Sequence, residues 1–159
     1  MFTLSIAILL CGINAGEANS WPAFLGSGAT AVNAEQLPLQ WKPTENIAWR
    51  ADLPGHGQSS PVIWGERVFL TSVEGPNKEN YQVICLDLKT GQQLWTKSLK
   101  NSAPVANSVY VSRAAPTPTV DAQRVVAQFE SGDCVAFDHD GQLLWQRDLS
   151  KDYGPFVAE

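Results

Sequence analysis

The sequence predicts an all-β protein built from tandem four-stranded antiparallel sheets, and three observations carry that prediction. First, "IAWRADL", "QLWTKSL" and "LLWQRDL" place a tryptophan four residues before a leucine, at Trp49, Trp95 and Trp145, spaced by 46 and then 50 residues. Second, "SPVIWGERVFLTS" from Ser60 and "TPTVDAQRVVAQF" from Thr117 share a proline, an apolar pair, a turn and an Arg-Val pair. Third, the 12 glycines and 10 prolines suit short strands and tight turns better than long helices.

Within each repeat the apolar runs separate into four short strands. In the first repeat they are "PVIW", "RVFLTS", "YQVICLDL" and "QQLWTKSL", with turn residues between them. The last turn is "DLKTG" at Asp87–Gly91 in one repeat and "DHDG" at Asp138–Gly141 in the other, and both are typical of hairpins. The middle turn differs, because "EGPNKEN" at Glu74–Asn80 is a longer polar loop than "ESGD" at Glu130–Asp133. We therefore expect one sheet over residues 59–99 and another over residues 116–149.

A four-stranded unit of about 40 residues that recurs in tandem is typical of a β-propeller blade. One blade cannot bury its own two faces, so it needs a copy beside it. Propellers close with about four to eight blades. The two blades here, with an orphan outer strand at residues 47–53 and an extended segment at residues 21–46, therefore predict an incomplete ring.

The orphan strand at residues 47–53 would complete the last blade of a closed ring. Three explanations for the missing blades stay open: the chain is truncated at its carboxyl end, several chains assemble, or the edge is left exposed. Truncation is the explanation that we carry forward.

The amino terminus predicts a secretory signal peptide over residues 1–20. The apolar run "LSIAILLCGI" is followed by small and polar residues, and cleavage after Ala18 or Ser20 fits the small-residue rule. No Lys or Arg precedes the run, and a buried first strand is the alternative. The run is shorter than the roughly 18 residues of a membrane span, so no span is predicted. A lipid anchor at Cys11 is not favoured, because Leu10 stands where lipidation sites carry a small residue.

Charge and composition exclude one class of partner. The chain of 159 residues holds 11 basic and 16 acidic residues, for a net charge of -5, and no cluster of Lys and Arg that could follow a phosphate backbone. Its hydrophobic content of 44% is enough for a core. We therefore expect a globular, secreted or periplasmic protein that does not bind nucleic acid.

Several of these strings also carry a family resemblance. "WPAFLG" at Trp21–Gly26, "TENIAW" at Thr44–Trp49, "SSPVIWGERVFLT" from Ser59 and "LDLKTGQQLW" from Leu86 resemble the start of secreted bacterial PQQ-like β-propeller repeat proteins. That family is related to the quinoprotein alcohol dehydrogenases and to the propeller scaffold of the outer-membrane β-barrel assembly machine. The string "YGPF" at Tyr153–Phe156 resembles the linker before a third blade.

Resemblance to the dehydrogenases would imply pyrroloquinoline quinone, a Ca²⁺ site of Glu, Asn and Asp ligands, a catalytic Asp and a pair of adjacent cysteines. The three cysteines here, Cys11, Cys85 and Cys134, are all isolated in the sequence. We therefore expect a non-catalytic binding or scaffolding module, without an evident cofactor, whose protein partner docks on loops such as Glu74–Asn80. Two alternatives remain: the amino-terminal part of a quinone- and calcium-dependent dehydrogenase with its ligands in missing blades, or the product of an interrupted gene.

Cys85 and Cys134 precede Asp87 and Asp138 by two and four residues, which places them on the same face of equivalent strands in neighbouring blades. Packed sheets lie about 10 Å apart, whereas a disulfide needs Cα atoms within about 7 Å. We expect two buried free thiols, and a disulfide is the competing interpretation because the mature count is even.

The remaining polar residues predict no catalytic or metal site, and the residues that would bind a cofactor stay unknown. His56, in "PGHGQSSP", precedes a first strand and is expected to be a solvated turn residue, as is His139 in its hairpin. Four further residues flank the predicted innermost strands and are expected to line the channel rim simply because water reaches it; they are Gln58, Ser59, Arg113 and Thr117.

Overall fold

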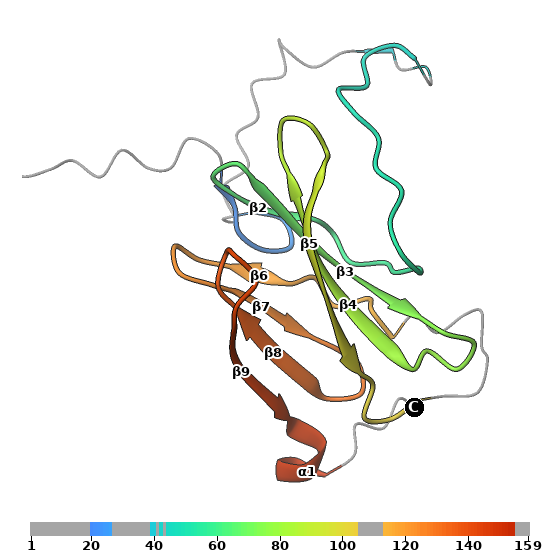
Figure 1. Cartoon of the computed structure of the whole chain (residues 1–159), viewed down its shortest axis with the longest axis vertical. Coiled ribbons are helices and arrows are strands. Elements are labelled where there is room, and N and C mark those ends of the chain that lie inside the picture. Colours follow the sequence, from blue (N-terminus) through green and yellow to red (C-terminus); the bar gives the residue numbers. More distant parts are fainter. Residues whose placement is uncertain (1–19, 27–38, 41, 43, 105–112, 155–159) are drawn as a thin grey trace, which may run out of the picture.

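The computed structural model, which describes residues 20–26, 39–40, 42, 44–104 and 113–154, contains two antiparallel sheets that lie face to face (Figure 1). The first sheet has five strands in the order β1-β2-β3-β4-β5, which are Ser20–Trp21, Val62–Trp64, Arg67–Glu74, Asn80–Asp87 and Gln93–Lys100. The second has four in the order β6-β7-β8-β9, which are Thr119–Val120, Val125–Gln128, Asp133–Phe137 and Leu143–Asp148. The prediction of an all-β fold with two four-stranded units is confirmed, and the two sheets fit an incomplete propeller.

The two sheets are copies of each other in register as well as in strand order. A bulge interrupts the pairing between Cys85 and Leu86 in β4, and another does so between Ala136 and Phe137 in β8. Each bulge follows the residue that stands two positions before the turn aspartate, which is Asp87 in one sheet and Asp138 in the other. The two outer hairpins can therefore be aligned residue by residue. Cys85 is therefore equivalent to Ala136, and Trp95 to Trp145.

The hairpin turns owe their shape to aspartates at their first position. Asp87 Oδ1 accepts from the Lys89 and Thr90 N–H groups at 3.0 and 2.8 Å and from the Thr90 hydroxyl at 2.8 Å. The Thr90 hydroxyl and these N–H groups lower the pKa of Asp87. Asp121 holds the turn before β7 in the same way, because the Gln123 and Arg124 N–H groups donate to its Oδ1 at 2.8 and 2.9 Å. Such side chains replace backbone partners that a tight turn lacks.

The core lies between the two sheets. At its centre the ring of Tyr81 stacks on that of Phe129, with ring centroids 3.9 Å apart and planes at 14°. Around it pack fully buried residues from both sheets, among them Val62, Phe69, Val73, Val83, Cys85, Val125, Ala127 and Val135. Strand β4, with both faces covered, is buried at Tyr81–Leu86, as the unbroken apolar run predicts.

The opposite face of the first sheet is covered by the segment at residues 47–53. Trp49 and Ala51 of this segment pack against the buried cluster of Val68, Ile84 and Leu86. The structure assigns no strand to residues 47–53, and the outer strand expected there stays a prediction. Its pairing in a closed ring, and the domain boundaries drawn from it, stay predictions.

Two elements were not predicted. Strand β1 adds to the inner edge of β2, where Ser20 pairs with Trp64 and Trp21 with Ile63. A short helix, α1 (Leu149–Tyr153), follows β9 and begins at Asp148, whose side chain accepts from the Ser150 N–H. No helix in the described part of the chain has the length and hydrophobicity to cross a membrane.

Candidate interaction surface

The junction between the two sheets centres on Trp95 of β5. Its indole Nε1 donates to the carbonyl of His139, 2.9 Å away in the β8–β9 turn. Its ring lies over Gly141, where a Cβ atom would meet Trp95 Cδ2 at 3.0 Å. Gly141 also has a φ of 81°, which favours glycine. Trp95 thus fixes the outer strand of the first blade onto the turn of the second.

Arg67, the first residue of β3, forms hydrogen bonds to the same turn. Its Nη1 donates to the His139 carbonyl, and its Nη2 bonds Asp140 Oδ1 at 2.7 Å. The ring of Phe69 lies beside the His139 ring, with centroids 5.7 Å apart. His139, expected to be a solvated turn residue, lies in the turn and is half-buried beside the junction, with its Nε2 2.9 Å from the Asp121 carbonyl.

A second tryptophan makes the equivalent contact on the other side of the first sheet. Trp49 Nε1 donates to the Leu88 carbonyl at 2.8 Å, and a Cβ atom at Gly91 would lie 2.4 Å from the Trp49 ring. In this contact, Leu88 supplies the carbonyl that His139 supplies to Trp95, and Gly91 lies under the indole ring as Gly141 does. Two of the three repeated tryptophans are docked on a glycine turn.

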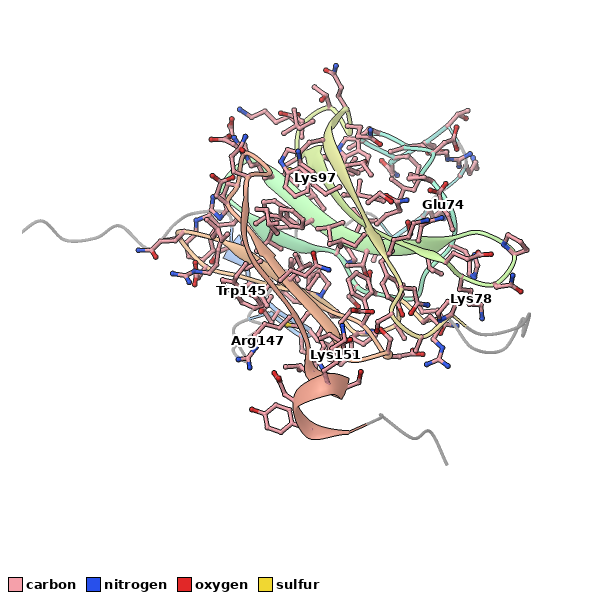
Figure 2. All side chains as sticks on the ribbon, turned by 60° about the horizontal axis from the view of Figure 1, so that its bottom comes forward. Glu74, Lys78, Lys97, Trp145, Arg147 and Lys151 are labelled. Atoms are coloured by element: carbon pink, nitrogen blue, oxygen red, sulfur yellow. The ribbon has the colours of Figure 1, made fainter. Side chains whose placement is uncertain are left out.

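The third tryptophan, Trp145, lies on the far face of the second sheet, which no other sheet covers in the described part of the chain. It is 36% exposed, and its neighbours Leu143 and Leu144 on β9 are 56% and 48% exposed. The pairing register places Trp145 beside Ala136, and Ala136 beside Val126, on that face. Figure 2 shows Trp145 and Arg147 along β9, with Lys151 on α1 below them. This open face, Val126, Cys134, Ala136, Trp145 and Arg147, is the candidate interaction surface.

A hollow of about 490 Å³ adjoins the lower end of this surface, where the end of β5 meets β8, β9 and α1. Two of its charged side chains, Lys151 and Asp148, pair with each other at the rim. Asp133, buried at its base, accepts from the Ser102 N–H at 2.8 Å and the Ser131 hydroxyl at 2.7 Å. Lys100 and Arg147 also line the hollow, so its lining has three basic and two acidic side chains.

The residues predicted to flank the innermost strands connect neighbouring segments. Gln58 N–H donates to the Ala114 carbonyl at 3.2 Å, and Thr117 Oγ1 accepts from the Ser60 N–H at 3.1 Å. Ser59 Oγ exchanges hydrogen bonds with the Thr71 backbone. The Arg113 N–H donates to the Glu130 carboxylate at 3.1 Å.

His56 is exposed and pairs through its backbone with Val73 at the end of β3. In the described part of the chain, no three His, Cys, Asp or Glu side chains gather into a group that could hold a metal ion.

The two described cysteines are free and lie on opposite sides of the second sheet. Cys85 faces the core between the sheets, where burial raises the pKa of its thiol to about 12. Cys134 belongs to the open face and is only half-buried, although burial raises the pKa of its thiol too. Free thiols were predicted correctly, but the full burial of Cys134 was not. Cys11 lies outside the described residues.

Sequence reasoning missed the part played by Arg67 and Asp140. The signal that could have found Arg67 was already present, because the Arg-Val pair recurs as Arg67-Val68 and Arg124-Val125 in the two repeats. An arginine that recurs at a strand start is a candidate for a contact between repeats.

Tandem four-stranded sheets that dock through a tryptophan on the next turn define a blade-repeat protein of the propeller class. A family model described as "Outer membrane protein assembly factor BamB" matches residues 19–154, so the chain belongs to this PQQ-like propeller family. Among 46 matching chains of solved structures is BamB from Moraxella catarrhalis, with 20% identity and a TM-score of 0.44 over 63% of this chain and 26% of that one. A comparison with curated proteins found no match.

Proposed function

We propose that this chain is the amino-terminal part of a longer, non-catalytic propeller that serves as a binding or scaffolding module outside the cytoplasm. One observation carries the proposal: Trp145 is built like Trp95, yet its docking turn is missing from the described residues. Membership of a family described as an outer-membrane assembly factor supports a scaffolding role. The expected signal peptide at residues 1–20 supports the location.

Completion by further blades fits the chain better than assembly of several copies. In a ring of identical chains, Trp145 of one copy would need the Gly91 turn of the next. Trp49 of the same chain already covers that turn, with its indole bonded to Leu88. In a longer propeller, residues 47–53 would serve as the outer strand of the last blade. Trp49 would then be the tryptophan that docks on the Gly91 turn, and no second tryptophan would compete for it.

The loop at Glu74–Asn80 supports docking of a protein partner on one end of the propeller. Gly75, Pro76 and Asn77 are exposed at its tip. The loop is held in shape by Asn101, whose side chain donates to the Lys78 carbonyl at 2.7 Å, and by the Glu79 carboxylate, which accepts from the Asn77 side chain at 3.0 Å. A pre-ordered, exposed loop loses little entropy on binding.

Deletion of the gene in its native host tests the scaffolding role. We expect the amount of folded outer-membrane β-barrel protein to fall at least about twofold and to be restored by the wild-type gene. A variant whose Glu74–Asn80 loop is replaced by the short "ESGD" turn of the second repeat should fold but fail to restore it. Unchanged amounts after deletion would overturn the role.

The dehydrogenase alternative has a separate test. Addition of the quinone and Ca²⁺ to the full gene product should give no dye-linked dehydrogenase activity. Activity that depends on both additions would replace the scaffolding proposal. The DNA beyond codon 159 decides between a longer propeller and an interrupted gene, because only the former encodes further tryptophan-bearing repeats.

A further inference from the structure

The amino-terminal strand β1 connects the inner edges of both sheets. It pairs antiparallel with β2, where Ser20 lies beside Trp64. The Pro22 carbonyl, directly after β1, accepts from the Val120 N–H of β6 at 2.9 Å, so the segment also bonds the second sheet. Figure 1 shows this segment, in blue, close to β2 and β6. One stretch of chain therefore bridges the two innermost strands.

The position of this segment follows from how a propeller is built. The first strand of each blade lines the central channel, and β2 and β6 are the first strands of the two sheets here. A strand that adds to the free edge of β2 therefore lies on the channel side of the blade, not on the outer rim. There it pairs with backbone groups of β2 that would otherwise lack a partner strand.

A tight turn follows β1 and presents two apolar side chains. The Gly26 N–H donates to the Ala23 carbonyl at 2.9 Å. Gly26 is buried against the Trp21 ring, where a Cβ atom would lie 3.0 Å from the ring. Phe24 and Leu25, between these anchors, are each 63% exposed. The turn is thus fixed at its ends, while its two largest side chains lie mostly uncovered in the described part of the chain.

The backbone of Leu25 indicates a further contact. Its φ of 64° lies in the left-handed region, which is strained for a leucine and relaxed for a glycine. Strained residues persist where the surrounding contacts fix them. The described part of the chain gives the Leu25 side chain little cover, and a turn beside β2 and β6 faces the channel. The inner strands of further blades would bound that channel, so they are the surface that fits.

We propose that residues 20–26 plug the central channel of the complete propeller, with Phe24 and Leu25 packed against the inner strands of the blades encoded beyond codon 159. The proposal rests on the proposed function, because only a longer propeller encloses a channel. Burial of two apolar side chains would favour closure of the ring. The partner surface is therefore apolar, and the plug would exclude a ligand from this part of the channel.

Cysteine labelling tests the proposal. Leu25→Cys in the 159-residue chain should react quickly with a maleimide, because the side chain at this position is exposed. The same variant of the full gene product should react at least about tenfold more slowly. Gln92→Cys, at an exposed position in the β4–β5 turn, is the matched control and should react at the same rate in both proteins. The rate of each parent protein without the new cysteine is subtracted.

A second pair of variants tests whether the turn itself holds the plug in place. Gly26→Ala combines a φ of 71° with a clash against the Trp21 ring, so it should speed the labelling of Leu25→Cys in the full gene product at least about threefold. Gly65→Ala is the control, because its φ is also positive, at 59°, but its Cβ atom meets nothing within 4 Å. It should leave the labelling rate unchanged.

The proposal is overturned if Leu25→Cys reacts as fast as Gln92→Cys in the full gene product. Protection that disappears on about tenfold dilution would also overturn it, because the cover would then be a second copy. Equal labelling rates with Gly26→Ala and Gly65→Ala would do the same. These outcomes differ from failure of the proposed function, since further blades beyond codon 159 together with fast labelling at Leu25→Cys would remove the plug alone.

Discussion

The closed junction between the two sheets and the open face of the second sheet are made of the same kinds of residue in two different states. At the junction, Trp95 is partly buried and its indole has a carbonyl partner. On the open face, Trp145 is 36% exposed and no ring of another sheet packs on it in the described part of the chain. The difference shows that each repeat presents a tryptophan to a neighbouring turn, and that this tryptophan becomes partly buried where the turn is present.

The largest expected effect comes from the centre of the closed junction. Phe129→Ala removes the ring stacked on Tyr81 and leaves a cavity in a fully buried site, so the free energy of unfolding should fall by about 3–5 kcal/mol. Leu143→Ala, at an exposed position at the start of β9, is the control and should cost about 0.5 kcal/mol or less. Urea unfolding measures both. Similar losses for the two variants would mean that Leu143 is covered in solution.

The tryptophans give the most direct comparison of the two states. Trp95→Ala should lower the free energy of unfolding by about 3 kcal/mol, because it removes packing on Phe69, Phe137 and Gly141 and leaves the His139 carbonyl with one donor fewer. Trp145→Ala should cost less than about 1 kcal/mol in this chain. Chemical denaturation checks both values, and an equal loss at the two sites would contradict the idea of an open face.

Alanine substitutions at two glycines separate the effect of the Trp49 contact on stability from that of backbone strain. Gly91 and Gly65 both have positive φ, at 71° and 59°. Alanine at Gly65 meets nothing within 4 Å and should cost about 1 kcal/mol. Alanine at Gly91 also strikes the Trp49 ring and should cost about 2–3 kcal/mol in thermal or urea unfolding. If the two variants lose the same amount, Trp49 does not press on this turn in solution.

The turn aspartates predict a smaller, pH-dependent effect. The Thr90 hydroxyl lowers the pKa of Asp87, and the Gln123 N–H, together with that of Arg124, lowers the pKa of Asp121. A depressed folded-state pKa means that the stabilisation is complete above the unfolded value, near pH 4, and is lost as the pH falls through the folded value. The unfolding midpoint should therefore drop as the pH falls below about 4. Asp87→Asn should flatten that drop, and a variant with the full wild-type pH dependence would refute the assignment.

Much of the fold was predictable because repetition makes local patterns unambiguous. Alternating and unbroken apolar runs placed β2 to β9, and the aspartate-glycine turns placed the hairpins. Strand β1 was not predictable, because Ser20–Trp21 pairs with β2 across some 40 residues and its two-residue length leaves no periodicity. The segment at residues 47–53 reads as a strand by composition, yet a strand also needs a neighbouring edge, which sequence cannot supply.

The candidate surface was less predictable than the fold. The repeat identified Trp145 by its position, but the roles of Arg67, His139 and Asp140 depend on how one sheet meets the next. A lone histidine in a polar hairpin is ordinarily solvated, and only the approach of Phe69 and Trp95 makes His139 part of a junction. Contacts between repeats leave no periodic signal of their own beyond the recurrence of the residues that make them.

The reactivity of the two cysteines measures how far solvent reaches the outer face of the second sheet. Cys85 faces the closed junction, and burial raises the pKa of its thiol to about 12, so almost no thiolate forms at pH 8. Cys134, on the open face, is half-buried and should react with a disulfide-exchange reagent at least about tenfold faster in the folded Cys11→Ser chain. Cys134→Ser should abolish the fast phase, whereas Cys85→Ser should leave it. Equal, slow rates for both thiols would show that the face bearing Trp145 is already covered, and the distinction between the two states of the repeat would then fail.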